Sequence, residues 1–236
     1  MNALSRELHD FLLDKGASLC GFADLRGVVE GDLHGGVSVA VKLPVSVLQS
    51  IKDGPSRIYF DAYHDINEKL DGLVTAGADF LAERGYRVYA RTRANVKEHP
   101  GYRTDLPHKT VATRAGLGWI GKSALLVTKE YGPAIRLSSL LTDAPVTTGE
   151  PIGKSKCGNC TACMDHCPGK AISGKLWDVK MDRDEFFDAA ACRKAARALS
   201  AELLNEEISL CGKCIEVCPY TKGYIRRSME NERVML

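Results

Sequence analysis

The chain has 236 residues, of which 44% are hydrophobic and 26% are charged, and its formal net charge is +2 at pH 7. This composition is typical of a soluble globular protein, and no uncharged apolar run approaches the roughly 20 residues that a transmembrane helix needs. The opening residues, MNALSRELHDFLLDKG, mix charged and apolar side chains at helical spacing, which argues against a signal peptide. We therefore expect a cytoplasmic protein that does not contact a membrane.

The first 150 residues have the pattern of an α/β domain. Apolar residues that recur every three or four positions predict a helix over residues 3–13 and a long helix over residues 57–84. Short apolar runs predict five strands, at residues 17–23, 37–43, 86–90, 123–128 and 134–141. Strands and helices that alternate in this way predict one domain over residues 1–150.

The composition changes after this domain. Residues 143–156 are rich in Pro, Gly, Thr and Lys, which is typical of a linker. Apolar strands then give way to cysteines, so we expect a second domain over residues 151–222. Residues 223–236 are predicted to form a basic, amphipathic C-terminal tail.

The stretch AGLGWIGKS, residues 115–123, matches two nucleotide-binding patterns at once. Its three glycines fit G-x-G-x-x-G, and its Gly-Lys-Ser ending fits G-x-x-x-x-G-K-[ST]. A phosphate-binding loop should follow a buried strand and lead into a helix. Here polar, helix-like residues precede the glycines and the strand-like SALLVT follows them, so the sequence argues against a nucleoside triphosphate site.

Basic residues gather in the same part of the chain. Residues 84–122 contain nine Lys and Arg against two acidic residues and so carry +7, which leaves −5 on the remainder. Such a segment can attract an anionic ligand or nucleic acid, or it can be a solvated face of the fold. The sequence favours the two interpretations equally.

Eight of the nine cysteines lie in the predicted second domain. CGNCTACMDHCP, residues 157–168, has the spacing C-x2-C-x2-C-x3-C-P of bacterial ferredoxins, in which the fourth cysteine binds the other cluster. The pattern returns as CGKCIEVCP at residues 211–219, with Ile208 in place of its first cysteine, and Cys192 is the remaining thiol that can replace it. A zinc site is the alternative, but tetrahedral zinc does not require four cysteines in eleven residues.

The ferredoxin pattern assigns the eight thiols to two [4Fe–4S] clusters with four ligands each. One set is Cys157, Cys160, Cys163 and Cys218, and the other is Cys167, Cys192, Cys211 and Cys214. Cys20 lies in an apolar predicted strand and is interpreted as a buried structural thiol.

The chain from Tyr59 to Tyr220 resembles the epoxyqueuosine reductase family and its shorter double-cluster relatives, which are related to the core of reductive dehalogenases. The resemblance is carried by AGLGWIGKSALLVTKEYG, by LTD, and by the two cysteine runs with a single cysteine between them. It implies an α+β protein with an N-terminal α/β sandwich, similar to nitroreductase-type cobalamin domains, followed by a small domain that resembles bacterial ferredoxin. It also implies an iron–sulfur oxidoreductase whose clusters deliver electrons to cobalamin.

The same resemblance implies roles for particular residues. The Gly-rich block is expected to face cobalamin through Gly116, Leu117, Gly118, Trp119, Ile120, Gly121 and Lys122. Lys122 and the basic segment would then contact the phosphate tail of the corrinoid or an anionic substrate. The family's proton-donating aspartate is matched by Asp105, with His108 as a rival, and its tyrosine by Tyr63 in the Tyr63-His64 pair.

Other functions remain open. The chain could be a non-catalytic, low-potential electron carrier, or a reductive activator of a separate corrinoid protein, with no cobalamin of its own. It could also be an RNA-binding module with structural clusters. A ferredoxin or flavodoxin is the expected electron donor. The tRNA-modifying members of the family carry a further helical-repeat domain, and the sequence ends at Leu236, so tRNA is a weaker expectation than a small substrate.

Overall fold

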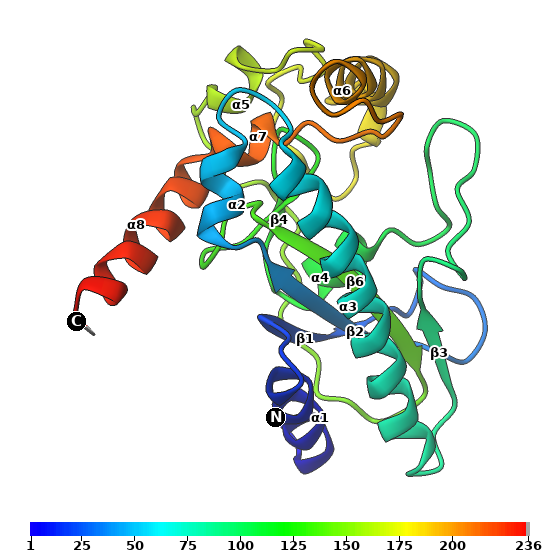
Figure 1. The fold of residues 1–236 in the computed structure, drawn as a ribbon. Coiled ribbons are helices and arrows are strands. Elements are labelled where there is room, and N and C mark those ends of the chain that lie inside the picture. Colours follow the sequence, from blue (N-terminus) through cyan, green and yellow to red (C-terminus); the bar gives the residue numbers. More distant parts are fainter. Residues whose placement is uncertain (235–236) are drawn as a thin grey trace. The chain divides into compact units, whose positions relative to one another are not determined.

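A computed structural model describes residues 1–234, which form two compact units (Figure 1). The first unit contains residues 1–41, 65–118 and 136–153. The second contains residues 42–64 and 119–135, together with the described residues from 154 onward. The chain therefore changes unit several times, whereas the sequence predicts single boundaries after residues 150 and 222. Local patterns do not reveal which distant segments will pack together.

The first unit is built on a four-stranded sheet with the strand order β1-β2-β6-β3. These strands are β1 (Leu19–Asp24), β2 (Gly35–Lys42), β6 (Ile135–Thr142) and β3 (Val88–Arg91). β1 pairs antiparallel with β2, and β3 pairs antiparallel with β6 in a register that sets Arg91 opposite Ser139. Four of the five predicted strands are thus found in this sheet.

The fifth predicted strand, at residues 123–128, is mostly not a strand. Only β5 (Leu126–Val127) is extended and paired, and its partner is the equally short β4 (Trp119–Ile120). Ala124, between them, has a positive φ of 59° and its N–H donates to the carbonyl of Gly121. The turn interrupts the apolar run, and for this reason the periodicity predicted a longer strand than the structure contains.

Helices cover both faces of the sheet (Figure 1). On one face, α1 (Ala3–Asp14) and α3 (Arg57–Ala82) approach β6, where Gly77 lies close to Leu12 and Leu140. On the other face, α4 (His108–Arg114) packs on β1, and Val111 reaches Gly36 of β2. The helices predicted at residues 3–13 and 57–84 are confirmed within two residues at their ends. The mixed α/β character of the prediction is confirmed with them.

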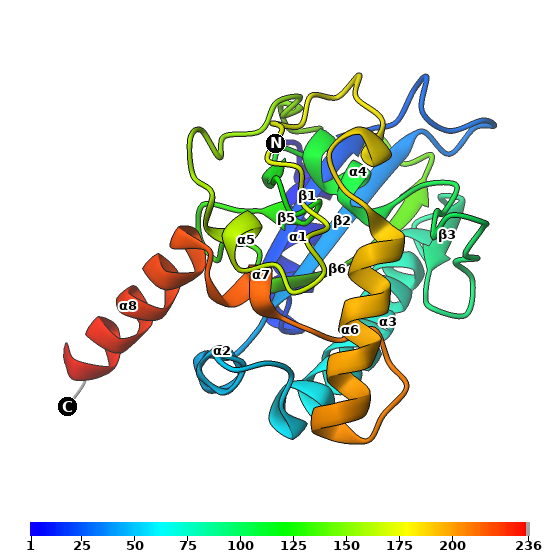
Figure 2. The same ribbon diagram turned by 90° about the horizontal axis from the view of Figure 1, so that it is seen from above.

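The second unit is mainly helical. Its helices are α2 (Val45–Ser50), α5 (Ala162–Asp165), the 3-10 helix η1 (Arg183–Glu185), α6 (Ala189–Leu204), α7 (Lys213–Glu216) and α8 (Pro219–Val234). α7 packs against α5, α2 and α8, which places the two cysteine runs beside each other (Figure 2). The predicted tail continues α8 as far as Val234, and Met235 and Leu236 lie outside the described residues. No helix of the described residues is long and apolar enough to cross a membrane.

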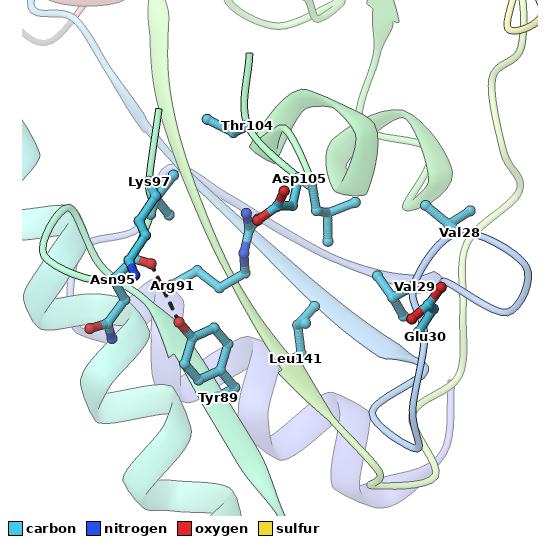
Figure 3. A pocket seen from close by; sticks show the side chains of 12 residues that line it. Val28, Val29, Glu30, Tyr89, Arg91, Asn95, Lys97, Thr104, Asp105 and Leu141 are labelled. Atoms are coloured by element: carbon cyan, nitrogen blue, oxygen red, sulfur yellow. Dashed lines mark hydrogen bonds between the residues drawn. The ribbon is translucent and has the colours of Figure 1, made fainter. Parts of the chain in front are cut away.

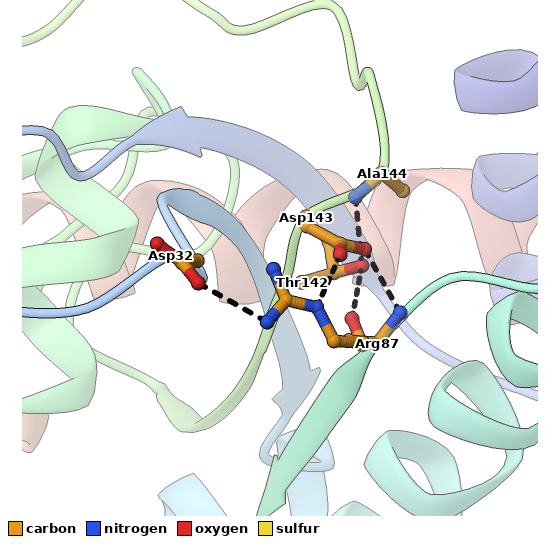
Figure 4. A network of polar contacts seen from close by, with 5 residues as sticks. All are labelled: Asp32, Arg87, Thr142, Asp143 and Ala144. Atoms are coloured by element: carbon orange, nitrogen blue, oxygen red, sulfur yellow. Dashed lines mark hydrogen bonds and ion pairs between the residues drawn. The ribbon is translucent and has the colours of Figure 1, made fainter.

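The predicted linker is held against the first unit as far as residue 153. The backbone N–H of Gly149 donates to the carbonyl of Phe22 in β1, and that of Ile152 donates to the carbonyl of Thr113 in α4. Asp143, at the start of the predicted linker, accepts hydrogen bonds from Arg87 on both carboxylate oxygens. Arg87 also donates a hydrogen bond to Asp32 (Figure 4). The guanidinium of Arg87 lowers the pKa of Asp143. This segment is therefore a strap over the first unit rather than a loose connection.

The strap gives a test of the fold, because a Cβ added at Gly149 would collide with the carbonyl oxygen of Ala115. We expect Gly149→Ala to destabilise the protein by about 1–3 kcal/mol, since the backbone of the strap would have to move. Gly72→Ala is the matched control: it lies in α3 with no atom near its new Cβ and should stabilise by about 0.5–1 kcal/mol. Urea unfolding of both variants checks the sign of each change. Equal effects would contradict the proposed packing of the strap.

Candidate functional site

The thiols of the second unit come from the ends and first turns of short helices. Cys157 and Cys160 precede α5, Cys163 lies in it, and Cys167 follows it. Cys192 lies in the first turn of α6, which begins after Asp188 caps the N–H of Ala191. Cys211 precedes α7, Cys214 lies in it, and Cys218 comes directly before α8. All eight side chains are partly buried.

The mutual influence of the thiols shows which of them lie together. The pKa of Cys163 is raised to about 11, first by burial and then by Cys157, Cys218 and Cys160. Burial likewise raises the pKa of Cys192 to about 11, with Cys167 and Cys211 as the next contributors.

Cys214 also has a raised pKa, first because of burial and then because of Cys211 and Cys192. The structure thus brings together the same two sets of four that the ferredoxin spacing predicts. Cys214 is influenced by Cys163 as well, so the two sets are neighbours.

The donor set fits a pair of [4Fe–4S] clusters. Cubane clusters are held by four thiolates, and binding to the metal deprotonates a thiol that burial would otherwise keep neutral. Among the described side chains, no three His, Cys, Asp or Glu are grouped closely enough to hold a single metal ion, whereas a cubane cluster sets its four thiolates around a larger body. One pocket is lined by Gly121, Lys122, Pro219 and five of the thiols: the first set, Cys157, Cys160, Cys163 and Cys218, together with Cys214 of the second set. In the other set, the N–H of Ala171 points to the Sγ of Cys167 at 3.4 Å.

The Gly-rich block is buried against protein. In the first unit, Gly116 has φ +75° and a Cβ there would lie 2.8 Å from the carbonyl oxygen of Glu150. In the second unit, Trp119 is 1% exposed and makes an edge contact with Tyr220, with 5.1 Å between ring centroids. Lys122 is 6% exposed and its Nζ donates to the carbonyl of Cys160 at 2.8 Å.

These contacts decide how the block can act. The side chains of Trp119, Ile120 and Lys122 are occupied by protein contacts, so they do not offer a surface for a corrinoid ring as they lie. Leu117 is partly exposed but packs toward Gly21. The last residues of the block, Gly121 and Lys122, line the pocket that contains Cys157, Cys160, Cys163 and Cys218.

The first unit contains a cavity of about 520 Å³ on the α4 side of the sheet (Figure 3). Asp105 lies at its edge with a side chain that is 87% exposed, and its Oδ1 is 2.8 Å from Nε2 of His99. Arg91 enters the cavity from the end of β3 and is 6% exposed. The cavity brings the predicted acid close to a buried cation that sequence reasoning did not single out.

His108 lies at the start of α4, next to this cavity. Its Nδ1 is 2.9 Å from Oγ of Ser139, which also accepts a hydrogen bond from Nη1 of Arg91 at 3.2 Å. Burial, and then the charge of Arg91, lowers the pKa of His108 to about 4. The imidazole is therefore neutral at pH 7 and serves to orient Ser139 rather than to supply a proton as imidazolium.

Tyr63 and His64 belong to the second unit, whereas Asp105 and His108 belong to the first. The rings of Tyr63 and His64 meet edge to face at 5.3 Å, and His64 also contacts Phe60. Cys20, in β1, is buried, and this burial raises its pKa to about 12. It is a core thiol, as predicted.

Arg91 and Ser139 could have been noticed in the sequence. In the run YRVYAR, the strand ends on a charged residue at a position that alternation places on the same face as Tyr89. A charge at the end of an otherwise apolar strand is a signal for a functional or paired group. Its partner on β6 could not be named, because the register between the two strands is a tertiary feature.

Comparison with known proteins identifies a family and individual proteins that are similar to this chain. Residues 156–221 match the family described as the 4Fe-4S double cluster binding domain. The epoxyqueuosine reductase of Lactococcus garvieae (strain Lg2) is 32% identical over 170 residues, which cover 69% of this chain and 42% of that protein. The chain is a double-cluster relative of the epoxyqueuosine reductases. It spans about two fifths of the length of the curated relative.

Solved structures show the same fold. An epoxyqueuosine reductase from Bacillus subtilis, whose catalytic loop is swung out of its active site, has a TM-score of 0.59 at 22% identity, over 94% of this chain and 66% of that one. A reductive dehalogenase whose structure suggests a mechanism for B12-dependent dehalogenation has a TM-score of 0.65 at 16% identity, over 92% of this chain and 32% of that one. At these identities the likeness concerns the fold alone.

The division of the thiols is testable one cluster at a time. We expect Cys157→Ser and Cys218→Ser to disturb the same cluster and Cys192→Ser to disturb the other, because the first two remove ligands from one set and the third removes a ligand from the other set. Each variant should lose up to about four iron atoms per chain after anaerobic reconstitution. Iron analysis with electron paramagnetic resonance measures this, and Cys20→Ala, outside both sets, is the control. If Cys157→Ser and Cys218→Ser altered different signals, the partition would be wrong.

Proposed function

We propose that this chain is a cytoplasmic iron–sulfur oxidoreductase that resembles epoxyqueuosine reductase. In this proposal two [4Fe–4S] clusters bound by the second unit pass electrons to a cobalamin held by the first, for reductive chemistry on a small or tRNA-borne substrate. The observation that carries the proposal is the grouping of eight cysteines into two neighbouring sets of four. When bound, the clusters supply single electrons and the corrinoid supplies a strongly reducing cobalt.

The chain's own residues support this function in distinct ways. The eight thiols would hold the clusters, and the closeness of Cys214 to Cys163 keeps the two sets near enough for an electron to pass between them. The cavity of the first unit would hold the substrate. At its edge, the contact between Asp105 and His99 can hold a proton on a solvent-exposed loop. We propose Asp105 as the acid, with Tyr63 as a second candidate, while His108 orients Ser139.

The fold of the first unit is compatible with this proposal. A sheet with α1 and α3 on one face and α4 on the other is expected for a sandwich of the nitroreductase type. A reductive dehalogenase of similar fold is described as B12-dependent, which supports cobalamin as the acceptor. A ferredoxin or flavodoxin is proposed as the donor. tRNA remains the weaker candidate for the substrate carrier.

A second function is favoured by one observation. Trp119, Ile120 and Lys122, which are expected to contact cobalamin, are buried against protein. This favours a non-catalytic electron carrier, or a reductive activator of a separate corrinoid protein. In that case the two thiol sets keep their role and the first unit serves as a docking or substrate module.

Anaerobic titration with cobalamin separates the two functions. If the first unit binds cobalamin, the reconstituted protein should shift its visible spectrum at stoichiometric concentration, and reduction of the clusters should then yield cobalt(I). Asp105→Asn should leave both spectral changes intact and lower substrate turnover, because it removes only a proton donor; a loss of about 10²–10⁴-fold is typical of general acids. No spectral shift with fully assembled clusters would exclude cobalamin binding and leave the carrier.

A further inference from the structure

The cavity of the first unit contains a buried cation that is not matched by a buried acid. Arg91 is 6% exposed, and Arg91 and Lys122 are the two charged side chains that are buried among residues 1–231. The hydrogen bond from Nη1 of Arg91 reaches the neutral hydroxyl of Ser139 at 3.2 Å. In the described part of the chain Arg91 forms no ion pair with a carboxylate. Burying such a charge is costly unless a partner compensates it.

Arg91 is the buried member of the charged residues that line the cavity. Lys97, Asp105 and Glu30, the other charged residues of the lining, are exposed, and Asp105 is paired with His99 (Figure 3). Burial lowers the pKa of Arg91, and the charge of Asp105 offsets this only in part. His108 adds no charge at pH 7 because its pKa is about 4. The remaining N–H groups of Arg91 therefore face a cavity in which no acceptor of the chain bonds them.

We propose that this cavity binds an oxyanion group, a carboxylate or a phosphate, through the guanidinium of Arg91. A planar guanidinium can donate two parallel hydrogen bonds to such a group, and Lys97 is a further cation in the lining of the cavity. The inference rests on the proposed function in one respect: the oxyanion belongs either to the substrate or to the phosphate of the corrinoid. Both sources share the same chemistry at Arg91.

Calorimetry on the full-length, reconstituted protein tests this with inorganic phosphate and benzoate as probes. We expect Arg91→Gln to weaken binding of at least one probe about tenfold or more, and Arg91→Lys to weaken it less. Arg6→Gln, an exposed residue of α1, removes the same charge elsewhere and should change nothing. Thermal unfolding verifies that each variant is folded. The proposal is overturned if the wild type binds neither probe, or if Arg91→Gln binds both unchanged.

Two corrinoids distinguish the sources of the oxyanion. If the corrinoid phosphate is bound, Arg91→Gln should weaken binding of cobalamin but not of cobinamide, which lacks that phosphate. If the substrate is bound, both corrinoids should bind the variant as they bind the wild type, while the small probes are lost. Anion binding without any corrinoid binding would refute the cobalamin part of the proposed function and leave the anion site standing.

A separate observation concerns Lys122, the other buried charge. Its Nζ donates to the carbonyl of Cys160 at 2.8 Å, and the side chain lines the pocket that holds Cys157, Cys160, Cys163 and Cys218, with Cys214 of the other set at the same pocket. It forms no ion pair with a carboxylate in the described residues. The ammonium is therefore held in the wall of one thiol set by a neutral carbonyl, although the sequence suggested contact with a corrinoid phosphate.

We infer that Lys122 positions the loop of Cys160 and raises the reduction potential of the cluster bound by this set. Reduction adds one electron from an external one-electron donor to the cluster, and no bond is formed or broken. The added negative charge interacts favourably with a nearby ammonium in a region of low dielectric constant. The same charge acts less strongly on the other cluster, so the lysine also sets the difference between the two potentials.

Redox titration followed by electron paramagnetic resonance tests this on the reconstituted full-length protein. Lys122→Gln keeps a hydrogen-bond donor without the charge and should lower the potential of one cluster by about 59 mV, which is a tenfold change in its equilibrium constant. Lys122→Arg keeps the charge and should restore the wild-type value. Lys129→Gln, which is exposed in the same unit, is the matched control.

Each other outcome contradicts the inference. Unchanged potentials in Lys122→Gln would show that the charge has no effect on the cluster. Equal shifts in both clusters, or the same shift in Lys129→Gln, would assign the effect to overall charge. Loss of the cluster in Lys122→Arg as well as in Lys122→Gln, shown by iron analysis, would reduce the role of Lys122 to folding.

Discussion

The second unit depends on one constraint: eight thiols must be taken out of water in two groups of four. Burial raises the pKa of these thiols, so as free ligands they resist the ionised form that metal binding requires. A metal–sulfur cluster reverses this preference, because it stabilises each thiolate directly. The short helices α5 and α7 and the first turn of α6 then serve to hold ligands in place. Larger apolar side chains come from earlier in the sequence, among them Leu48, Ile51 and Trp119.

The Gly-rich block shows how one motif can be divided between structural tasks. The chain passes from the first unit to the second between Gly118 and Trp119. Before that point, Gly116 permits close contact with the backbone of the strap; after it, Gly121 and Lys122 complete the wall of a thiol pocket. A glycine is required at position 116 because backbone meets backbone there, and this requirement resembles that of a loop that approaches a ligand closely.

The two buried positive charges, on Arg91 and Lys122, lie where the proposed function brings in negative charge. Arg91 faces the cavity of the first unit, and Lys122 faces a thiol set of the second. Each side chain bonds a neutral oxygen rather than a carboxylate. A neutral partner compensates a buried charge only in part, so both sites gain energy when negative charge enters their surroundings. An anion bound in the cavity would supply negative charge near Arg91, and reduction of the cluster would supply it near Lys122.

The sequence alone determined the features that depend on local spacing. The cysteine intervals predicted two sets of four, and periodicity predicted α1, α3 and the strands β1, β2, β3 and β6. Asp105 and His108 were singled out by resemblance, but whether they were exposed or buried depended on the packing around β3 and β6. Tertiary structure alone decided three features: the register that sets Arg91 opposite Ser139, the strap over β1, and the packing of residues 42–64 and 119–135 with the cysteine-containing unit. These features join residues far apart in the chain, and their energies come from burial and hydrogen bonds that exist only once those segments meet.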